Sequence, residues 1–452
     1  MLKPIPNVTL LKTFLNARNL FNNPIGVIDA YFEKFKTDSF RTPMGPKDIV
    51  LLSKNPTLAK HILQKNHKNY HKSKIQSEIL ARFIGKGLLT SNGNYWLKQR
   101  RLIQPGFHKK NLNSFLQIMH HEIQAYIAEF SIRHPKKAHT VDISTEMSKI
   151  TMRVVSRALF SSQVEEAEIE FIGKSVDALQ IALSKDIRLP FLSWWRQLSG
   201  EEKKNNKLAK KLYDLICDKI NERKRSGPVD GDLLDMLLQV RYEESGEGMS
   251  EQQLVDEILV LYAAGYETTA NSLAWTLYLL AKNPEHLQRL SKEVDSVNLT
   301  GELKMETIFQ LPFTTKVTSE SLRLFPPVWI IDRLALEEDE IDGIKIRKGE
   351  MINIYILGIH RSEKYWKDPH RFDPERFEGE KHIKTDFTYL PFGGGPRLCI
   401  GYQFAKLELS LVLHYILKHY KISLPKNQVI TMKPMVALKP NIPIKMILTK
   451  RN

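Results

Sequence analysis

The sequence predicts a single domain, residues 1–452, that is mainly helical with a minor sheet. Helix-period spacing of apolar residues dominates from about Leu51 to Arg323. After Pro326-Pro327 the pattern changes to short β-branched runs separated by turn residues. No internal repeat or low-complexity segment interrupts this order, and 42% hydrophobic residues suffice for a sizeable core.

The longest predicted helix begins after Ser250, a candidate N-cap whose capping-box partner is Gln253. Its apolar pattern continues to about Asn283, where Pro284 ends it. Apolar residues lie nearly all round, so we expect this helix to cross the interior. The stretch 263–269, with one glycine and two threonines, is expected to distort the helical hydrogen bonds locally.

The C-terminal third is predicted to hold the sheet. Strands are expected at Ile341–Ile346 and Met351–Ile356, and again within Leu424–Leu448. Between them lies a loop at about 362–396, too long for a plain connection and therefore expected to be functional. A helix over Gly401–His419 follows it.

Charge and cysteine content limit the function. Lysine and arginine total 67 against 51 acidic residues, a net charge of +16, which favours an acidic partner. The basic runs at 203–211 and 223–225 lack interleaved aromatic residues, so nucleic acid is not expected as the partner. Two cysteines exclude a disulfide scaffold and fit a reducing cytoplasm. No apolar run is long enough to span a bilayer.

Cys399 is the residue with the most telling surroundings. Three glycines and two prolines precede it, and a predicted helix begins just after it. Glycines let a flat ligand approach the backbone closely. The helix N-terminus and the nearby Arg397 both favour thiolate over thiol. These features predict a metal-ligating thiolate in place of a structural cysteine, whereas Cys217, within a helical stretch, is expected to be inert packing.

At these residues the sequence resembles the cytochrome P-450 family. The segment Phe392–Gly401 fits the family signature F-x-x-G-x-R-x-C-x-G at every specified position. The other family motifs follow the family's order along nearly the whole chain, as W-x-x-x-R at 96–100, A-G-x-[DE]-T at 264–268, E-x-x-R at 320–323 and the aromatic-arginine segment at 373–377. Each short motif is weak alone, but five in order are very specific.

The resemblance implies haem b lying between the long helix and the cysteine loop, with Cys399 as the iron ligand. Phe392 would pack on the thiolate side of the haem. The residues implied for the two propionates are Arg397, Arg333, Trp96 and Arg100, since arginine suits a carboxylate. Ala264, Gly265 and Gly401 complete the implied cofactor contacts, with Ala264-Gly265 leaving room for dioxygen.

Two further groups take roles from the resemblance. Glu267 and Thr268 resemble the family's acid–alcohol pair, which would deliver protons to iron-bound oxygen. Glu320 and Arg323, joined by Arg376, would lock the scaffold around the haem and are expected to be structural.

The implied reaction inserts one atom of O2 into a hydrophobic molecule such as a fatty acid, terpenoid or carotenoid. By family position Val328, Trp329, Ala437 and Leu438 would reach the substrate. No nucleotide-binding glycine fingerprint opens a strand–helix unit, so electrons are expected from a separate acidic ferredoxin or flavodoxin. A peroxide-using or isomerising member of the same fold and a non-enzymatic haem-thiolate sensor remain alternatives.

Overall fold

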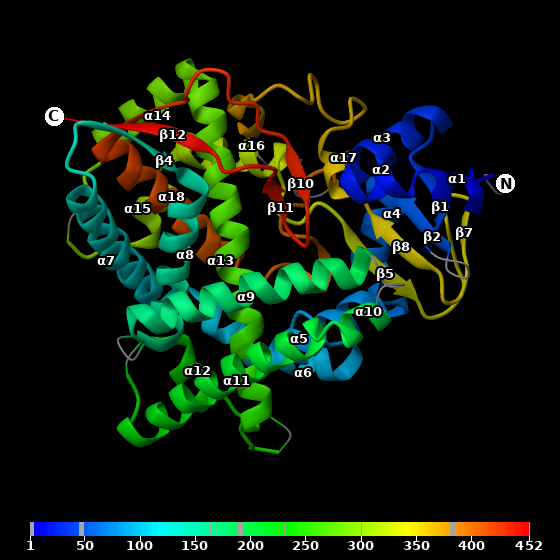
Figure 1. Cartoon of the computed structure of the whole chain (residues 1–452), viewed down its shortest axis with the longest axis horizontal. Coiled ribbons are helices and arrows are strands. Elements are labelled where there is room, and N and C mark those ends of the chain that lie inside the picture. Colours follow the sequence, from blue (N-terminus) through cyan, green and yellow to red (C-terminus); the bar gives the residue numbers. More distant parts are fainter. Residues whose placement is uncertain are drawn as a thin grey trace. The chain divides into compact units, whose positions relative to one another are not determined.

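The computed structural model describes residues 4–44, 49–161, 164–188, 193–229, 231–243, 245–299, 301–379 and 386–451. Within these ranges the chain is mainly helical with small sheets, which confirms the predicted fold class (Figure 1). The chain forms two compact units. One comprises Met1–Lys74, Ser319–Cys399 and Met432–Lys439, and the other Ile75–Thr318, Ile400–Thr431 and Pro440–Asn452. The single domain expected from the sequence stays a prediction.

The first unit contains the larger sheet. Its helices are α1 (Leu10–Leu15), α2 (Ala17–Asn22), α3 (Pro24–Phe35), α4 (Pro56–Lys60), the π-helix η1 (His61–Lys65), α17 (Ile356–His360) and the 3-10 turns η2 (His67–Asn69), η7 (Pro374–Phe377) and η8 (Gly395–Arg397). Its strands are β1 (Ser39–Pro43), β2 (Ile49–Ser53), β3 (Tyr70–His71), β5 (Ile331–Ala335), β6 (Asp339–Ile341), β7 (Ile344–Ile346), β8 (Met351–Ile354), β10 (Met432–Pro434) and β11 (Leu438–Pro440).

The five-stranded sheet has the order β1-β2-β8-β5-β3 and is covered on both faces. Successive side chains of β2 point to opposite faces of the sheet. Leu51 packs into one apolar cluster with Leu63 and Leu390, whereas Val50 and Leu52 pack into another cluster on the opposite face. The side with Leu51 is the one that supports the cysteine loop, because Leu390 directly precedes that loop.

The second unit is mostly helix. Its elements are η3 (Ile75–Leu80, π), α5 (Ala81–Ile84), α6 (Gly93–Ile103), η4 (Gln104–Phe107, 3-10), α7 (Lys109–Arg133), β4 (Ala138–Asp142), α8 (Ile143–Phe160), α9 (Glu166–Arg188), α10 (Ser193–Leu198), α11 (Glu201–Ser226), α12 (Leu233–Gln239), α13 (Glu251–Lys282), α14 (Pro284–Ser296), α15 (Met305–Phe309), α18 (Tyr402–His419), β9 (Tyr420–Ser423) and β12 (Lys445–Lys450). The helix α16 (Pro312–Leu324) begins in this unit and ends in the other. Strands β4, β12 and β9 form a three-stranded sheet.

The long helix predicted from the sequence is α13. Ser250 caps it, and the reciprocal capping box with Gln253 is formed. It packs against α8 and α18, and most of its side chains are buried (Figure 1). The expected distortion at 263–269 is wrong, since α13 remains α-helical there. The threonine hydroxyls donate back to carbonyls four residues earlier instead: Thr268 to Ala264 at 2.7 Å and Thr269 to Gly265 at 3.0 Å.

Most predicted C-terminal elements are present as β6, β7, β8, α18 and β10–β12. The expected start of the helical region at Leu51 is wrong, because Leu51 lies in the middle of β2. A strand buried on both faces reads as a continuous apolar run, whose sequence carries no period to separate it from a helix.

No helix of the described residues combines the length and apolarity needed to cross a membrane.

Candidate active site

The cysteine loop folds back on itself before Cys399. The Cys399 N–H donates to the Phe392 carbonyl at 3.0 Å, and the Leu398 N–H donates to the Gly395 carbonyl at 3.0 Å. Gly393 and Gly395 have φ of +72° and +67°, in the left-handed region where residues with a Cβ are strained. Cys399 therefore lies beside Phe392 and is exposed. Its exposure and backbone support suit a ligand-binding thiol.

Gly395 also allows the backbone of the cysteine loop to lie close to the backbone of η1. A Cβ at this position would run into the carbonyl oxygen of Leu63 in η1. Gly394 is nearly as confined, since a Cβ there would lie 2.7 Å from the Phe387 ring. The signature glycine Gly395, with Gly393 and Gly394 before it, is thus needed for the turn and for its packing against η1 and the apolar cluster beneath.

Basic side chains gather beside this loop. Burial and the neighbouring Arg333 lower the pKa of Arg397 to about 9. Burial also lowers the pKa of Arg333, on β5, to about 10, although Asp332 partly opposes the shift. The pKa of His71 is lowered by burial and by Arg397. A buried and a half-buried cation that repel one another favour an anionic ligand, so the two propionates of a haem fit this site.

A buried carboxylate–arginine cluster supports the loop from the C-terminal end of α16. The Arg323 guanidinium donates to both oxygens of Glu320, at 2.7 and 2.8 Å. Arg376 Nε and the Asp373 N–H donate to the same carboxylate at 3.1 and 2.9 Å. Arg323 and Glu320 are 0% exposed, and Arg323 also donates to the carbonyls of His360 and Pro369. The structure thus brings together the three residues grouped by the family resemblance.

His360 links that cluster to the cysteine loop and was not identified from the sequence. The Leu390 N–H donates to its Nε2 at 2.7 Å, so Nδ1 carries the proton and donates to the Arg323 carbonyl at 3.2 Å. Burial and the nearby Arg323 lower the His360 pKa to about 3, which keeps the ring neutral. A single histidine ending an apolar run gives no sequence signal for such a bridge.

The long helix of the second unit presents a small accessible patch. Ala264 is exposed and Gly265 and Thr268 are half-buried, although most of α13 is buried. Glu267, the next residue to Thr268, is buried. The Thr268 hydroxyl donates its hydrogen bond to the Ala264 carbonyl. The lone pairs of Thr268 Oγ1 therefore remain able to accept a hydrogen bond. The helix therefore offers a small-residue surface with a hydroxyl acceptor beside a buried acid.

The remaining predicted cofactor residues of this unit lie on α6 and at the start of α18. Trp96 is buried, and Arg100, four residues on along α6, is half-buried and donates from Nε to Gln104 at 3.2 Å. Gly401 is the N-cap of α18, two residues after Cys399. The helix N-terminus expected to favour thiolate thus follows the cysteine directly in the chain.

The predicted substrate residues come together in the first unit but differ in exposure. The Leu438 N–H donates to the Pro327 carbonyl at 2.8 Å, and Trp329 Nε1 donates to the Met435 carbonyl at 3.1 Å. Trp329 and Leu438 are buried in the apolar cluster beneath, and Ala437 is buried as well. Val328, beside Trp329, and Val436, beside Ala437, have exposed apolar side chains, with exposed fractions of 37% and 41%.

Comparison with known proteins identifies the family of the chain. Residues 3–448 match the family Cytochrome P450. Cyclooctatin synthase from Streptomyces melanosporofaciens is 32% identical over 89% of this chain and 87% of its own length. Carotene epsilon-monooxygenase, chloroplastic, from Arabidopsis thaliana is 30% identical over 87% of this chain and 76% of its own length.

A solved structure, the haem domain of cytochrome P450DA, matches the fold with a TM-score of 0.88 at 23% identity, covering 100% of this chain and 99% of the other. With the family match over nearly every residue, the chain belongs to the cytochrome P450 family and is a haem-dependent oxidoreductase that incorporates oxygen.

Proposed function

We propose that Cys399 is the axial ligand of the haem and that Arg333 and Arg397 hold its propionates. The observation that carries this proposal is the pair of guanidiniums, one buried on Arg333 and one half-buried on Arg397, beside a glycine-supported loop that ends in an exposed cysteine; the pKa values of both guanidiniums are lowered. Phe392 accepts the Cys399 N–H through its carbonyl and packs on the thiolate side. Trp96, Arg100, Ala264, Gly265 and Gly401 complete the contacts in this proposal.

Haem bound through a cysteinate supplies the activation of dioxygen. The role of this chain's own residues is to bring protons to a confined site. Glu267 takes up a proton from solvent, and Thr268 holds a water or an oxygen-bound proton at the accessible face of α13. Glu320, Arg323 and Arg376 act structurally, by fixing the segment from which the cysteine loop begins.

The proposed substrate is a hydrophobic molecule of terpenoid, carotenoid or fatty-acid type. Support comes from the names of the relatives, which include cyclooctat-9-en-7-ol 5-monooxygenase from Streptomyces melanosporofaciens and carotene epsilon-monooxygenase. Support also comes from the two apolar side chains, Val328 and Val436, exposed next to the residues expected at the substrate.

Binding of this class is tested by titrating the ferric protein with a carotene, with cyclooctat-9-en-7-ol and with a long-chain fatty acid. The expected result is a change of the Soret spectrum with at least one of them, weakened in Val328→Asp and unchanged in Ile132→Asp, a matched substitution on α7 where the side chain is 79% exposed. No spectral change and no oxygenated product with any of the three would reject the lipophilic substrate.

Electrons come, in this proposal, from a separate acidic ferredoxin or flavodoxin in the cytoplasm. The net charge of +16 supports an acidic partner, and such attraction weakens with salt. Reduction by an acidic ferredoxin should therefore slow steeply as ionic strength rises. A rate that does not respond to salt would contradict the charge argument.

A further inference from the structure

The loop between α5 and α6 folds against two carboxyl groups of the long helix α13. The Lys86 N–H donates to Asp256 Oδ2 at 2.8 Å, and the Leu88 N–H donates to Glu257 Oε2 at 2.9 Å. Both acidic residues are buried, with exposed fractions of 7% for Asp256 and 0% for Glu257. Because buried backbone N–H groups need acceptors, these two side chains fix the path of the loop.

Two glycines allow the loop to lie this close to α13. Gly85 has φ of +77°, in the left-handed region that favours glycine. A Cβ on Gly87 would lie 2.9 Å from Glu257 Oε2 and 3.0 Å from the Asp256 carbonyl oxygen. The Thr90 hydroxyl closes the turn by donating to the Gly85 carbonyl at 2.7 Å. The glycine pair in this loop therefore serves the contact with α13.

A second contact fastens α6 itself to the same end of α13. Gln99 Nε2, on the buried face of α6, donates to the Tyr242 hydroxyl at 3.1 Å, and Gln253 Nε2 of α13 donates to the same oxygen. Gln99 is 0% exposed and directly precedes Arg100. The side chains that hold α6 and those that hold the loop before it thus lie within about one turn of α13.

The helix held in this way carries Trp96 and Arg100, which are proposed above for the haem propionates. It begins at Gly93, five residues after Leu88. Side chains that bind a cofactor keep their geometry only where a surrounding layer of hydrogen bonds holds the elements that carry them. The loop contact and the Tyr242 contact supply such a layer for α6.

We propose that Asp256 and Glu257 are positioning residues for the haem: they hold the loop before α6 and thereby place Trp96 and Arg100 at the propionates. The Tyr242 contact holds the helix itself. Neither carboxyl group touches the cofactor in this proposal. The inference rests on the propionate roles proposed for Trp96 and Arg100, which Arg100→Gln tests separately.

Haem release from the holoprotein, followed as transfer to apomyoglobin, tests the proposal. Glu257→Leu removes the acceptor of the buried Leu88 N–H, so haem release should be about tenfold faster or more. Glu257→Gln keeps an amide oxygen that accepts the same bond and should stay within about twofold of the wild-type rate. The matched control Glu251→Leu, also on α13, removes a side chain that is 49% exposed and lies 3.5 Å from Lys224, and should release haem at the wild-type rate.

Two further readouts separate positioning from general destabilisation of the fold. If Glu257 acts through α6, Glu257→Leu should accelerate haem release much less in an Arg100→Gln background than in the wild type, whereas independent effects would multiply. The propionate bending band of the resonance Raman spectrum responds to hydrogen bonds at the propionates. It should shift in Glu257→Leu in the same direction as in Arg100→Gln, and should return to its wild-type position in Glu257→Gln.

A gentler variant covers the case in which Glu257→Leu does not fold. Asp256→Ala removes the acceptor of the Lys86 N–H and should release haem about threefold faster or more, with the same shift of the propionate band. Wild-type release and an unshifted band in this variant would overturn the proposal as surely as they would in Glu257→Leu.

Multiplicative effects in the double variant, or a Glu257→Gln protein that loses haem as fast as Glu257→Leu, would also overturn the proposal. The response of Arg100→Gln tells the two levels apart. If Arg100→Gln changes haem release and the band but the changes at Asp256 and Glu257 do not, only the positioning role is rejected. If Arg100→Gln itself changes neither, the propionate role of Arg100 is rejected and the inference with it.

Discussion

Replacing Glu320 with alanine removes the acceptor that compensates two arginines. The carboxylate of Glu320 accepts hydrogen bonds from Arg323 Nε and Nη2, from Arg376 Nε and from the Asp373 N–H. After the substitution the Arg323 guanidinium stays buried, still bonded to the His360 and Pro369 carbonyls but with no carboxylate recorded within ion-pair distance among the described residues.

The expected cost follows from that burial. Removing one partner of a fully buried ion pair costs about 3–5 kcal/mol, because the remaining charge is left without compensation. Native domains have about 5–15 kcal/mol of stability in total, so the loss is about a fifth of it or more. The segments held by Glu320 lie on both sides of His360, which anchors Leu390 at the start of the cysteine loop. Glu320→Ala should therefore yield protein without haem instead of a slower holoprotein.

The assay is the ratio of haem to protein after purification, together with urea unfolding of whatever apoprotein folds. The matched control is Glu337→Ala, which removes an ion pair to Lys348 whose side chains are 70% and 66% exposed. That change should cost about 0–1 kcal/mol and leave haem content unchanged. A Glu320→Ala protein with full haem and wild-type unfolding would refute the structural role.

Three other substitutions test the site. The contribution of His360 to wild-type stability should fall by about 1.4 kcal/mol per pH unit from about pH 6.5 toward pH 3, because the unfolded ring takes up a proton that the buried ring does not; His360→Phe should reduce the slope of stability against pH by that amount while costing about 1–3 kcal/mol at pH 7, as urea unfolding at several pH values would show. Arg397→Gln should weaken haem affinity about tenfold or more, measured as haem transfer to apomyoglobin; unchanged transfer would remove Arg397 from the propionate site. Thr268→Ala should raise the share of consumed oxygen released as hydrogen peroxide, whereas Thr269→Ala, which removes a buried hydroxyl that donates to the Gly265 carbonyl, should not.

The features predictable from the sequence are those with a local signature. The capping box at Ser250 and Gln253, the end of the long helix before Pro284 and the turn at Asp342-Gly343 between β6 and β7 each need only neighbouring residues. The pattern before Cys399 is equally local, since Gly393 and Gly395 have positive φ and Gly395 leaves room for the Leu63 carbonyl.

Features that depend on distant segments could not be read from the sequence. The bridge from Arg323 through His360 to Leu390 joins three segments, and none of them carries a periodic pattern that pairs it with the others. The gathering of His71 with Arg333 and Arg397 depends on the strand order β8-β5-β3, which short apolar runs do not specify. The Glu320–Arg376 pair was anticipated through the order of the family motifs, not through any spacing rule.

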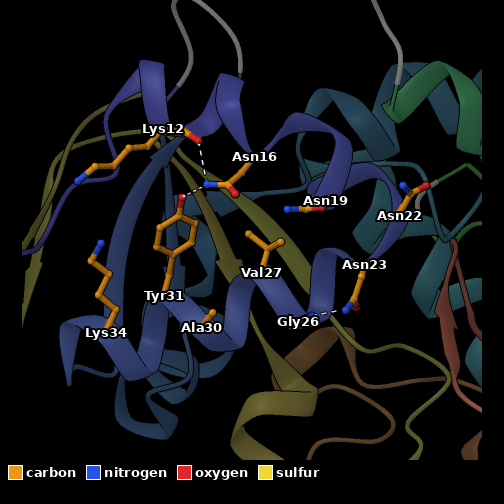
Figure 2. A pocket seen from close by; sticks show the side chains of 10 residues that line it. All are labelled: Lys12, Asn16, Asn19, Asn22, Asn23, Gly26, Val27, Ala30, Tyr31 and Lys34. Carbon is orange, nitrogen blue, oxygen red and sulfur yellow. Dashed lines mark hydrogen bonds between the residues drawn. The ribbon is translucent and has the colours of Figure 1, made fainter.

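Which apolar side chains are exposed to solvent also could not be predicted from the sequence. Trp329 and Leu438 are apolar residues at positions expected to reach substrate, but burial in the cluster beneath the sheet leaves Val328 and Val436 on the outside. The exposure of α1 was missed for the same reason, because apolar spacing in a helix predicts a buried face unless the surrounding structure is known. None of its six residues is buried, and a polar pocket of about 580 Å³ lies beside it, lined by residues of α1, α2 and α3 (Figure 2).

The thiolate ligand is the central claim, and the carbon monoxide difference spectrum of the dithionite-reduced protein tests it most directly. Cys399 as iron ligand predicts a strongly red-shifted Soret band in the wild type and its loss in Cys399→Ser, with Cys217→Ser, in α11, as the matched control that keeps the band. Haem bound without that shift in the wild type, or a shift that survives in Cys399→Ser, would contradict the account.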